Sequence, residues 1–362
     1  MKKQIAVFFG GESPEYEVSL QSATAVIRAV DTTKNDVILI GITKKGKWYL
    51  YEGPVEAISN NKWEQHSSCT IVSPIMDKSE SGVYVHRCAI SIETCKIDVA
   101  IPVLHGQNGE DGTIQGVLDL AGINYVGCGV FTSALCSDKV QVQKLVQNLG
   151  IQIAPSIHFD CEQIPHIRIQ DFIAQHDFPV FVKPIRAGSS IGISMVCHKD
   201  ALIPAIKHAA QFDTEVTIEK AIQGSEVGCG IIGNSKPIVG GVDEIELNSD
   251  FFNFTEKYEL LSAQIHMPAR IPLKTKRYIQ KAARAIYMAI HCEGLSRIDF
   301  FLQEDGQLIF NEVNTMPGFT EHSRFPTLMK EAGYCYETLI QTLIELAAEK
   351  RNGVIEHEAT KG

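Results

Sequence analysis

Two short motifs near the C-terminal end of the chain place oxygen ligands inside apolar segments. Arg297-Ile298-Asp299 begins one apolar run, and Asn311-Glu312-Val313-Asn314 ends a second one. Each run predicts a buried strand, and the Asp-Gly pair between them predicts the turn of an antiparallel hairpin that brings the acids and the amide close together. Two carboxylates and an amide on apolar strands suit a hard cation such as Mg²⁺. The alternative is a salt bridge from Arg297 to one acid.

A loop rich in glycine and serine, residues 183–192, follows a predicted buried strand. Its glycines permit close approach of the backbone to a ligand, its Ser189 and Ser190 hydroxyls can donate, and Lys183 and Arg186 add positive charge. The loop therefore predicts phosphate contacts, although it matches neither the Walker motif nor the Rossmann glycine spacing. A plain connection between two strands is the alternative, because such turns are common.

Length and charge restrict the classes of protein to which the chain can belong. The chain has 362 residues, a formal net charge of −10 and ten cysteines without a C-x-x-C pair. This length predicts two or three domains, and the acidic balance argues against a nucleic-acid or membrane partner. Scattered cysteines predict reduced thiols, and the apolar run at the N-terminus is too short for a signal peptide. We therefore expect a cytoplasmic protein, in which any anionic substrate would need a local basic pocket.

Apolar runs and one-sided helices divide the chain into successive units. The first third alternates strands with helices, as in an α/β domain with a buried parallel sheet, and carries a polar, partly hairpinned insertion over 45–93. A glycine-rich bend at 127–129, followed by a helix through Leu149, indicates a change of domain. We expect three domains and a mobile polar tail, with the boundaries 1–127, 128–223, 224–350 and 351–362.

These segments, in this order, resemble the ATP-grasp superfamily and, within it, the D-alanine-D-alanine ligases. The resemblance extends over essentially the whole chain, and its motifs are residues 10–19, 105–112, 183–192, 256–258, 297–299 and 311–318. It implies an α/β protein with the three-domain ATP-grasp architecture, in which ATP lies between the second and third units. It also implies two Mg²⁺ ions (or Mn²⁺) and a homodimer.

The implied reaction is the ATP-dependent joining of D-alanine to a second D-amino acid through an acyl phosphate. By resemblance, Glu15 holds the ammonium of the first D-alanine, and Ser189 links Glu15 to Tyr258 in a triad that closes the loop over the site. His105 lies near the first substrate. The residues alone favour a different interpretation of Glu15, as an acid at a helix N-terminus stabilised by the helix dipole, and of His105, as a histidine satisfied at a strand end.

The resemblance also implies a set of ATP, metal and oxyanion contacts. Lysines contact phosphates, the segment around Lys220 and Ile222 borders the adenine, and two glutamates accept hydrogen bonds from adenine and ribose. Arg297 and the Gly318 N–H stabilise the tetrahedral intermediate. The implied ATP-binding residues are Lys139, Lys183, Ser190, Glu219, Lys220, Ile222, Glu226 and Lys257. The implied metal ligands are Asp299, Glu312 and Asn314.

The second substrate is indicated by the segment after Gly318. Ser323, with Lys257, would bind its carboxylate, and Arg324 stands where ordinary D-Ala-D-Ala ligases have an apolar residue. A guanidinium offers donors to a hydroxyl and is a poor partner for a methyl group. The chain therefore resembles most the vancomycin-resistance D-Ala-D-Ser ligases of peptidoglycan synthesis. The alternatives are that Arg324 only pairs with a nearby acid, and that the chain is a housekeeping D-Ala-D-Ala ligase.

The lid segment, 248–264, retains Tyr258, which ester-forming members of the family lack, and this favours an amine as the nucleophile. Phe252 in the same segment departs from the usual tyrosine, without a clear consequence for the substrate. Three other classes remain as rivals: another ATP-grasp ligase, a nucleotide-binding regulatory protein and a dinucleotide oxidoreductase. The chain argues against the last class, because it lacks the G-x-G-x-x-G spacing that dinucleotide binding requires.

Overall fold

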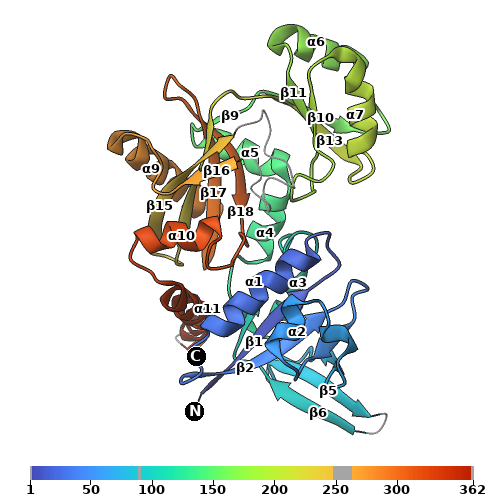
Figure 1. Cartoon of the computed structure of the whole chain (residues 1–362), viewed down its shortest axis with the longest axis vertical. Coiled ribbons are helices and arrows are strands. Elements are labelled where there is room, and N and C mark those ends of the chain that lie inside the picture. Colours follow the sequence, from blue (N-terminus) through green and yellow to red (C-terminus); the bar gives the residue numbers. More distant parts are fainter. Residues whose placement is uncertain (1, 89–90, 248–262, 360–362) are drawn as a thin grey trace.

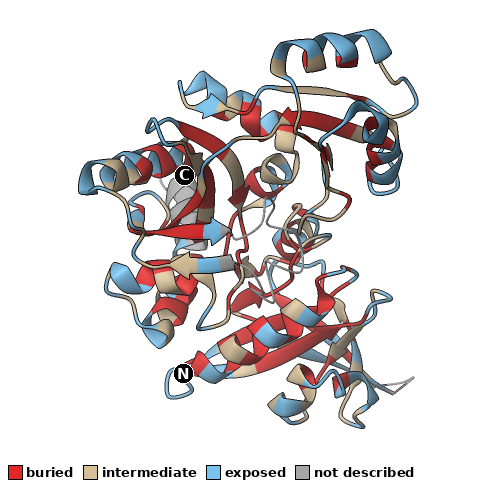
Figure 2. Ribbon diagram, turned by 45° about the horizontal axis from the view of Figure 1, so that its top comes forward, coloured by how far each residue is buried: buried red, intermediate tan, exposed pale blue. Residues whose placement is uncertain are grey.

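Three β-sheets form the frame of the protein (Figure 1). The computed structural model describes residues 2–88, 91–247 and 263–359. Figure 2 shows that buried residues run along the strands and along the sides of the helices that face them. The lid residues Phe252, Lys257 and Tyr258 lie outside the described residues.

The first sheet has the order β6-β5-β4-β3-β2-β1-β7-β8 and is parallel only between β2 and β8. The parallel strands are β1 (Lys3–Gly10), β2 (Asn35–Ile42), β7 (Val99–Pro102) and β8 (Asn124–Tyr125). The insertion over 45–93 supplies the antiparallel half, with β3 (Trp48–Leu50), β4 (Thr70–Pro74), β5 (Gly82–Cys88) and β6 (Ser91–Lys96). The helices of this region are α1 (Tyr16–Ala29), α2 (Val55–Ser59), a 3₁₀ turn at Trp63–Gln65 and α3 (Thr113–Leu120).

The second sheet is antiparallel and has the order β10-β13-β11-β12. Its strands are β10 (Ser156–Asp160), β11 (Val180–Pro184), β12 (Ser194–Val196) and β13 (Glu215–Lys220). The helices α6 (His166–His176) and α7 (Leu202–Ala209) and a 3₁₀ turn at Lys199–Ala201 accompany it. The glycine–serine loop follows β11, as predicted. It connects β11 to β12, which is an edge strand of this small sheet.

The third sheet has the order β16-β15-β14-β17-β18-β9. Its strands are β9 (Gln152–Ile153), β14 (Ser225–Ile232), β15 (Ile238–Leu247), β16 (Ala263–His266), β17 (Leu295–Leu302) and β18 (Leu308–Asn314), and its helices are α9 (Leu273–Ala289) and α10 (Arg324–Glu331). The predicted hairpin is confirmed: Asp299 pairs with Glu312 and Arg297 with Asn314, with a bulge after Asp299. Two pairs of polar side chains therefore share one end of the hairpin.

The predicted helix through Leu149 is two helices, α4 (Val130–Ser137) and α5 (Lys139–Asn148). Asp138 separates them because its backbone is extended and its side chain accepts a hydrogen bond from the Gln141 N–H at 2.9 Å, which caps α5. Val142 and Val146 of α5 pack into the core of the third sheet. The chain thus contributes α5 and β9 to the third sheet before it forms the strands of the second sheet.

The last helix, α11 (Tyr336–Ala359), packs against the first sheet although it comes from the C-terminal end of the chain. Leu343 and Ile344 share a buried core with residues of α1 and β1. The helix continues through Ala359, into the segment predicted to be a polar tail, and the mobility of that segment stays a prediction. In the part of the chain that the structure describes, no helix is long and apolar enough to pass through a bilayer. The domain boundaries themselves stay a prediction.

The packing of α11 gives a test of this fold. Ile344→Ala leaves a cavity between α11 and the first sheet, and we expect it to lower the free energy of unfolding by about 2–5 kcal/mol. Ile167→Ala, on the outer face of α6, is the control because its side chain is 74% exposed, and a change within about 0.5 kcal/mol is expected. Urea unfolding of both variants measures the difference, and equal midpoints would contradict the placement of α11.

Candidate active site

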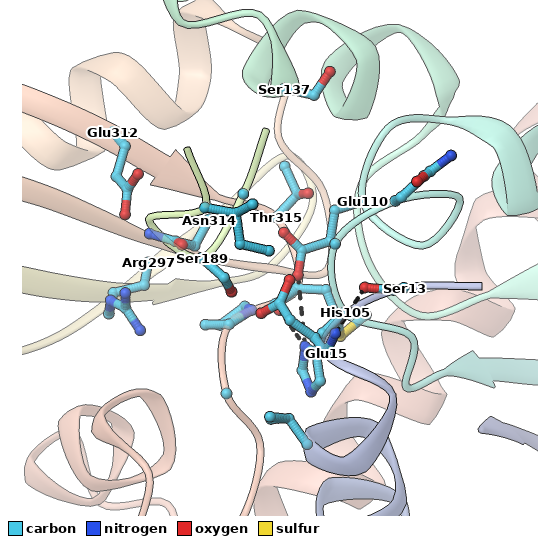
Figure 3. Close-up of a pocket in the computed structure, with 18 of the residues that line it drawn as sticks. Ser13, Glu15, His105, Glu110, Ser137, Ser189, Arg297, Glu312, Asn314 and Thr315 are labelled. Atoms are coloured by element: carbon cyan, nitrogen blue, oxygen red, sulfur yellow. Dashed lines mark hydrogen bonds and ion pairs between the residues drawn. The ribbon is translucent and has the colours of Figure 1, made fainter. Parts of the chain in front are cut away.

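A cavity of about 910 Å³ lies where loops from the three sheets meet, and its size is typical of a small-molecule site. It is lined by residues after β1 and β7, by the glycine–serine loop and by the end of β18 (Figure 3). The predicted site residues that line it are Glu15, His105, Lys139, Ser189, Arg297, Glu312, Asn314, Gly318, Ser323 and Arg324. Those that do not line it are Lys183, Ser190, Glu219, Lys220, Ile222, Glu226 and Asp299.

Glu15 lies at the N-terminus of α1 and is almost fully buried. Its side chain makes no capping hydrogen bond to the helix, so the helix-terminus alternative alone does not explain its position. Two glycines approach its carboxylate: a Cβ on Gly106 would stand 2.4 Å from Glu15 Oε2, and one on Gly188 would stand 3.6 Å away. The glycine–serine loop therefore reaches Glu15, and Ser189 beside Gly188 lies in the same cavity.

His105 is buried at the end of the first sheet and is held from both sides. Its Nδ1 lies 3.1 Å from the Met316 carbonyl oxygen and 3.5 Å from Glu110 Oε1, and its Nε2 lies 3.1 Å from Ser22 Oγ. Burial lowers the pKa of His105, but the Glu110 and Glu15 carboxylates raise it, and the net direction is upward. The expectation of a satisfied histidine is met, in a position that also lines the cavity.

Sequence reasoning quoted Glu110 within a motif but gave it no role. It lines the cavity beside His105, and burial raises the pKa of its carboxyl group. The signal was present in the sequence, because Glu110 lies five residues after His105 in a glycine-rich turn. Two carboxyl groups, Glu15 and Glu110, thus flank one imidazole, an arrangement suited to a substrate ammonium.

The hairpin carries a buried ion pair. Asp299 is completely buried, and the Arg297 guanidinium donates to it from Nε at 2.8 Å and from Nη2 at 2.7 Å. The Asn314 amide donates to the same carboxylate at 2.9 Å. Burial lowers the pKa of Arg297 and the charge of Asp299 raises it, with a net rise. The salt-bridge alternative is therefore present, together with the predicted gathering of acid and amide.

The same carboxylate faces a second guanidinium. Arg324, the first residue of α10, donates to Asp243 from Nε at 2.7 Å and from Nη2 at 2.9 Å, and to Glu226 from Nη1 at 2.9 Å. Its Nη2 lies 3.6 Å from Asp299 Oδ1. Sequence reasoning placed Arg324 in the site but missed Asp243, which comes from β15 and is close only through the pairing of β14 with β15. The ion cluster, as the term is used below, consists of Arg297, Arg324, Glu226, Asp243 and Asp299.

Gly228 of β14 makes room for the ion cluster. A Cβ at this position would stand 2.5 Å from Arg324 Nη2, 2.7 Å from Asp299 Oδ1 and 2.8 Å from Asp243 Oδ1. All three distances are shorter than carbon contacts permit. A glycine in the interior of a central strand, which by itself weakens the strand, is thus explained by the close approach of the guanidinium.

The hairpin provides ligands for a divalent cation only together with another molecule. Within residues 2–88, 91–247 and 263–359, no group of three or more His, Cys, Asp or Glu side chains is arranged to hold a metal ion. Asp299 and Glu312 are paired across the hairpin, and Asn314 adds an amide oxygen. Mg²⁺ is usually held by one or two carboxylates and by phosphate oxygens, so this donor set fits Mg²⁺ beside a bound nucleotide.

Among the lysines predicted for ATP contacts, those that the structure describes have protein partners. Lys183 pairs with the buried Glu219 at 2.5 Å, and Gln143 of α5 donates to the other oxygen of Glu219 at 3.1 Å. Lys139 donates to the Ala187 carbonyl at 2.6 Å. Lys220, the last residue of β13, donates to the backbone carbonyls of Asp177 and Phe178. Ile222 lies two residues beyond β13, where a strand had been predicted, because the pairing with β11 ends at Lys220.

Ser323 and Gly318 lie together at the start of α10. The Ser323 hydroxyl accepts a hydrogen bond from the Thr320 N–H at 3.1 Å and lies 2.7 Å from the Thr320 hydroxyl. A Cβ on Gly318 would stand 3.4 Å from Ser323 Oγ. The predicted oxyanion donor and the predicted carboxylate-binding serine therefore share one turn, beside Arg324.

Fold and site together define a ligase with the ATP-grasp fold. The family model described as D-ala D-ala ligase N-terminus matches residues 4–128, and the one described as D-ala D-ala ligase C-terminus matches residues 145–345. The chain belongs to the D-Ala-D-Ala ligase family, whose members depend on ATP and typically use Mg²⁺. The fold class and the resemblance predicted from the sequence are confirmed.

Relatives of two kinds are similar to the chain. It is 44% identical over 350 residues to the vancomycin C-type resistance protein VanC1 of Enterococcus gallinarum, covering 96% of this chain and 99% of that protein. It is 39% identical over 365 residues to a D-alanine--D-alanine ligase of Acetivibrio thermocellus, covering 97% of each. The crystal structure of the VanG D-Ala:D-Ser ligase from Enterococcus faecalis matches with a TM-score of 0.88 and 47% identity, over 96% of this chain and 100% of that chain.

The Lys183–Glu219 pair predicts a pH-dependent effect on stability. Burial raises the pKa of Glu219, but the charge and the hydrogen bond of Lys183 lower it by more, so the pKa is lowered overall. The pair therefore stabilises the fold at neutral pH, and this contribution is lost as the pH falls through the lowered pKa. Lys183→Met leaves a buried carboxylate without its cation, and we expect the free energy of unfolding to fall by about 3–5 kcal/mol at pH 7.5. The loss should shrink toward pH 5, because in the variant burial raises the pKa of Glu219 and the carboxylate takes up a proton.

Urea unfolding at the two pH values measures this effect. Lys44→Met is the matched control, because Lys44 pairs with Glu17 at 2.6 Å but both side chains are more than half exposed. Such a surface pair contributes only about 0–1 kcal/mol. A loss for Lys183→Met that is independent of pH, or no larger than that of the control, would show that Glu219 does not depend on Lys183.

Proposed function

We propose that the protein joins D-alanine to D-serine with ATP, through a D-alanyl phosphate, in peptidoglycan precursor synthesis of the vancomycin-resistance type. The observation that carries the proposal is the position of Arg324: the residue lines the cavity beside Ser323, and Asp243 orients its guanidinium. The relatives named for vancomycin resistance and for D-Ala:D-Ser ligation support the same substrate. A cytoplasmic homodimer stays a prediction.

In the first half of the reaction, the ammonium of D-alanine would rest between Glu15 and Glu110, and its carboxylate would attack the γ-phosphate of ATP. The loop containing Gly188 and Ser189 would lie over the phosphates, where backbone N–H groups can donate to oxygens. Asp299, Glu312 and Asn314 would hold Mg²⁺, which neutralises the polyphosphate as charge moves onto the transferred group. The products of this step are ADP and D-alanyl phosphate.

In the second half, the amine of D-serine would attack the carbonyl carbon of D-alanyl phosphate. Arg297 and the Gly318 N–H would stabilise the oxyanion of the tetrahedral adduct, since both line the cavity. Phosphate then leaves as the C–O bond breaks and the amide forms, and the amine loses a proton. Ser323 would accept the carboxylate of D-serine at the start of α10.

Arg324 has donors left for the hydroxyl of D-serine. A guanidinium has five N–H donors, and Asp243 and Glu226 take the Nε–H, one Nη1–H and one Nη2–H. One Nη1–H and one Nη2–H remain, the latter toward Asp299 at 3.6 Å. A hydroxyl of the substrate can accept from such a donor, whereas the methyl group of D-alanine cannot.

A housekeeping D-Ala-D-Ala ligase is the second candidate, and specific observations favour it. A D-alanine--D-alanine ligase is similar to the chain along 97% of its length. Arg324 also pairs with Asp243 and Glu226, as expected if it serves only the ion cluster. The two candidates differ in one measurable property, the preferred second amino acid.

The test is a matrix of amino-acid pairs scored by phosphate release and product mass. We expect the kcat/KM for D-serine as the second substrate to exceed that for D-alanine at neutral pH. Arg324→Met is expected to lower the ratio of the two kcat/KM values by about tenfold to a hundredfold, because a hydrogen bond from a charged donor contributes about 1.5–3 kcal/mol.

Arg270→Met is the matched control for this experiment. Arg270 also pairs with a buried acid of β15, Glu244, but it does not line the cavity. The control should leave the ratio unchanged. A wild-type preference for D-alanine would move the assignment to the second candidate, and an unchanged ratio in Arg324→Met would remove Arg324 from the choice of substrate.

A further inference from the structure

Arg186 lies two residues beyond the end of β11 and is surrounded by carboxylates. Its Nη2 lies 2.9 Å from Asp213 Oδ1 and 2.8 Å from Glu215 Oε2, and its Nη1 lies 3.4 Å from Asp138 Oδ2. Sequence reasoning counted Arg186 among the positive charges available to phosphate. Three negative neighbours more than balance its single positive charge, so its guanidinium is poorly placed to attract a polyphosphate.

Both ends of the glycine–serine loop are fixed on the segment that leads into β13. At one end, the Arg186 N–H and its guanidinium both donate to Asp213, at 2.7 and 2.9 Å. At the other end, Gly192 is so close to Phe212 that a Cβ would stand 2.6 Å from a ring carbon. The Asp213 side chain is 7% exposed and that of Arg186 is 40% exposed, so only the aspartate side of this anchor is shielded from water. The residues between these two points are held as a closed loop.

The N-terminus of α5 also contacts this loop, through one residue that accepts a hydrogen bond and one that donates a hydrogen bond. Asp138, the cap of α5, accepts from Arg186, while Lys139 of α5 donates to the Ala187 carbonyl at 2.6 Å. On its other side, α5 packs into the core of the third sheet. Arg186 therefore connects the second sheet, the loop and the helix that rests on the third sheet, on both sides of the proposed nucleotide cleft.

The segment held in this way is strained. Ser189 and Ser190 have φ values of 50° and 58°, in the left-handed region that non-glycine residues seldom adopt. Such a conformation costs free energy and persists only where the surroundings enforce it. The contacts of Arg186, the packing of Gly192 and the hydrogen bond from Lys139 to the Ala187 carbonyl all hold the loop that contains these two serines.

We propose that Arg186 is a positioning residue for nucleotide binding, which holds residues 187–190 in the conformation that receives the phosphates, with Asp213 as its main partner. The proposal rests on the proposed function in so far as the ligand is a nucleoside polyphosphate. Arg186 itself does not contact the phosphates. Disorder of the loop after removal of this anchor would misplace the N–H donors, and small misplacements at such sites cost up to about a hundredfold.

The experiment measures binding of MgADP by calorimetry, without either amino acid. R186Q and D213N are both expected to weaken binding by about tenfold or more, and R186K by less, because a lysine keeps the charge but cannot bridge the same oxygens. In steady-state assays of R186Q, the KM for ATP should rise by a larger factor than the KM for D-alanine, because the loop would receive the phosphates and only its Gly188 approaches Glu15.

R87Q is the matched control, because Arg87 bridges Glu52 and Glu93 at 3.0 and 3.1 Å on the antiparallel half of the first sheet, away from the cavity. Its affinity for MgADP should match wild type. Unchanged affinity for MgADP in R186Q would overturn the proposal. So would weakened affinity in R186Q together with unchanged or tighter binding in D213N, because this combination indicates direct contact between Arg186 and phosphate. An equal rise of the KM for ATP and the KM for D-alanine, with a lower melting temperature, would also overturn it. A wild-type enzyme that binds MgADP but prefers D-alanine contradicts only the proposed second substrate.

Discussion

The ion cluster is the constraint on which the rest of the site depends. Two guanidiniums, Arg297 and Arg324, face three buried carboxylates on neighbouring strands of the third sheet. Charges removed from water are tolerated only when each is paired and hydrogen-bonded, so none of these side chains can move independently of the others. The cluster leaves an excess of negative charge where the ATP-grasp fold is expected to take up a divalent cation.

The same cluster joins two parts of the reaction. On one side, Arg297 and Asn314 orient Asp299 at the end of the hairpin, where phosphoryl transfer would take place. On the other side, Asp243 orients Arg324 at the start of α10, beside the turn that would receive the second amino acid. A change in Arg324 therefore acts on the acceptor subsite and on the charge around Asp299 together. Under the proposed function, the substrate preference would be built into the same framework that would hold the nucleotide.

Local patterns in the sequence predicted the features that depend on neighbours along the chain. The hairpin register followed from two apolar runs and an Asp-Gly turn, and the glycine–serine loop followed from its composition. Contacts made by sheet pairing between distant strands were not predicted: Asp243 reaches Arg324 through β14 and β15, and Asp213 reaches Arg186 through the start of β13. The break at Asp138 was missed because a capping aspartate inside a helical pattern reads as a surface residue.

The most direct measurement of the central claim is a double-mutant cycle on Asp243 and Arg324, read as the ratio of kcat/KM for D-serine to that for D-alanine. If Asp243 acts by orienting Arg324, the combination of Asp243→Asn with Arg324→Met should shift the ratio no further than Arg324→Met alone, within about twofold. If the two effects multiply, Asp243 and Arg324 act separately on the substrate, and the account of the ion cluster as one unit is contradicted.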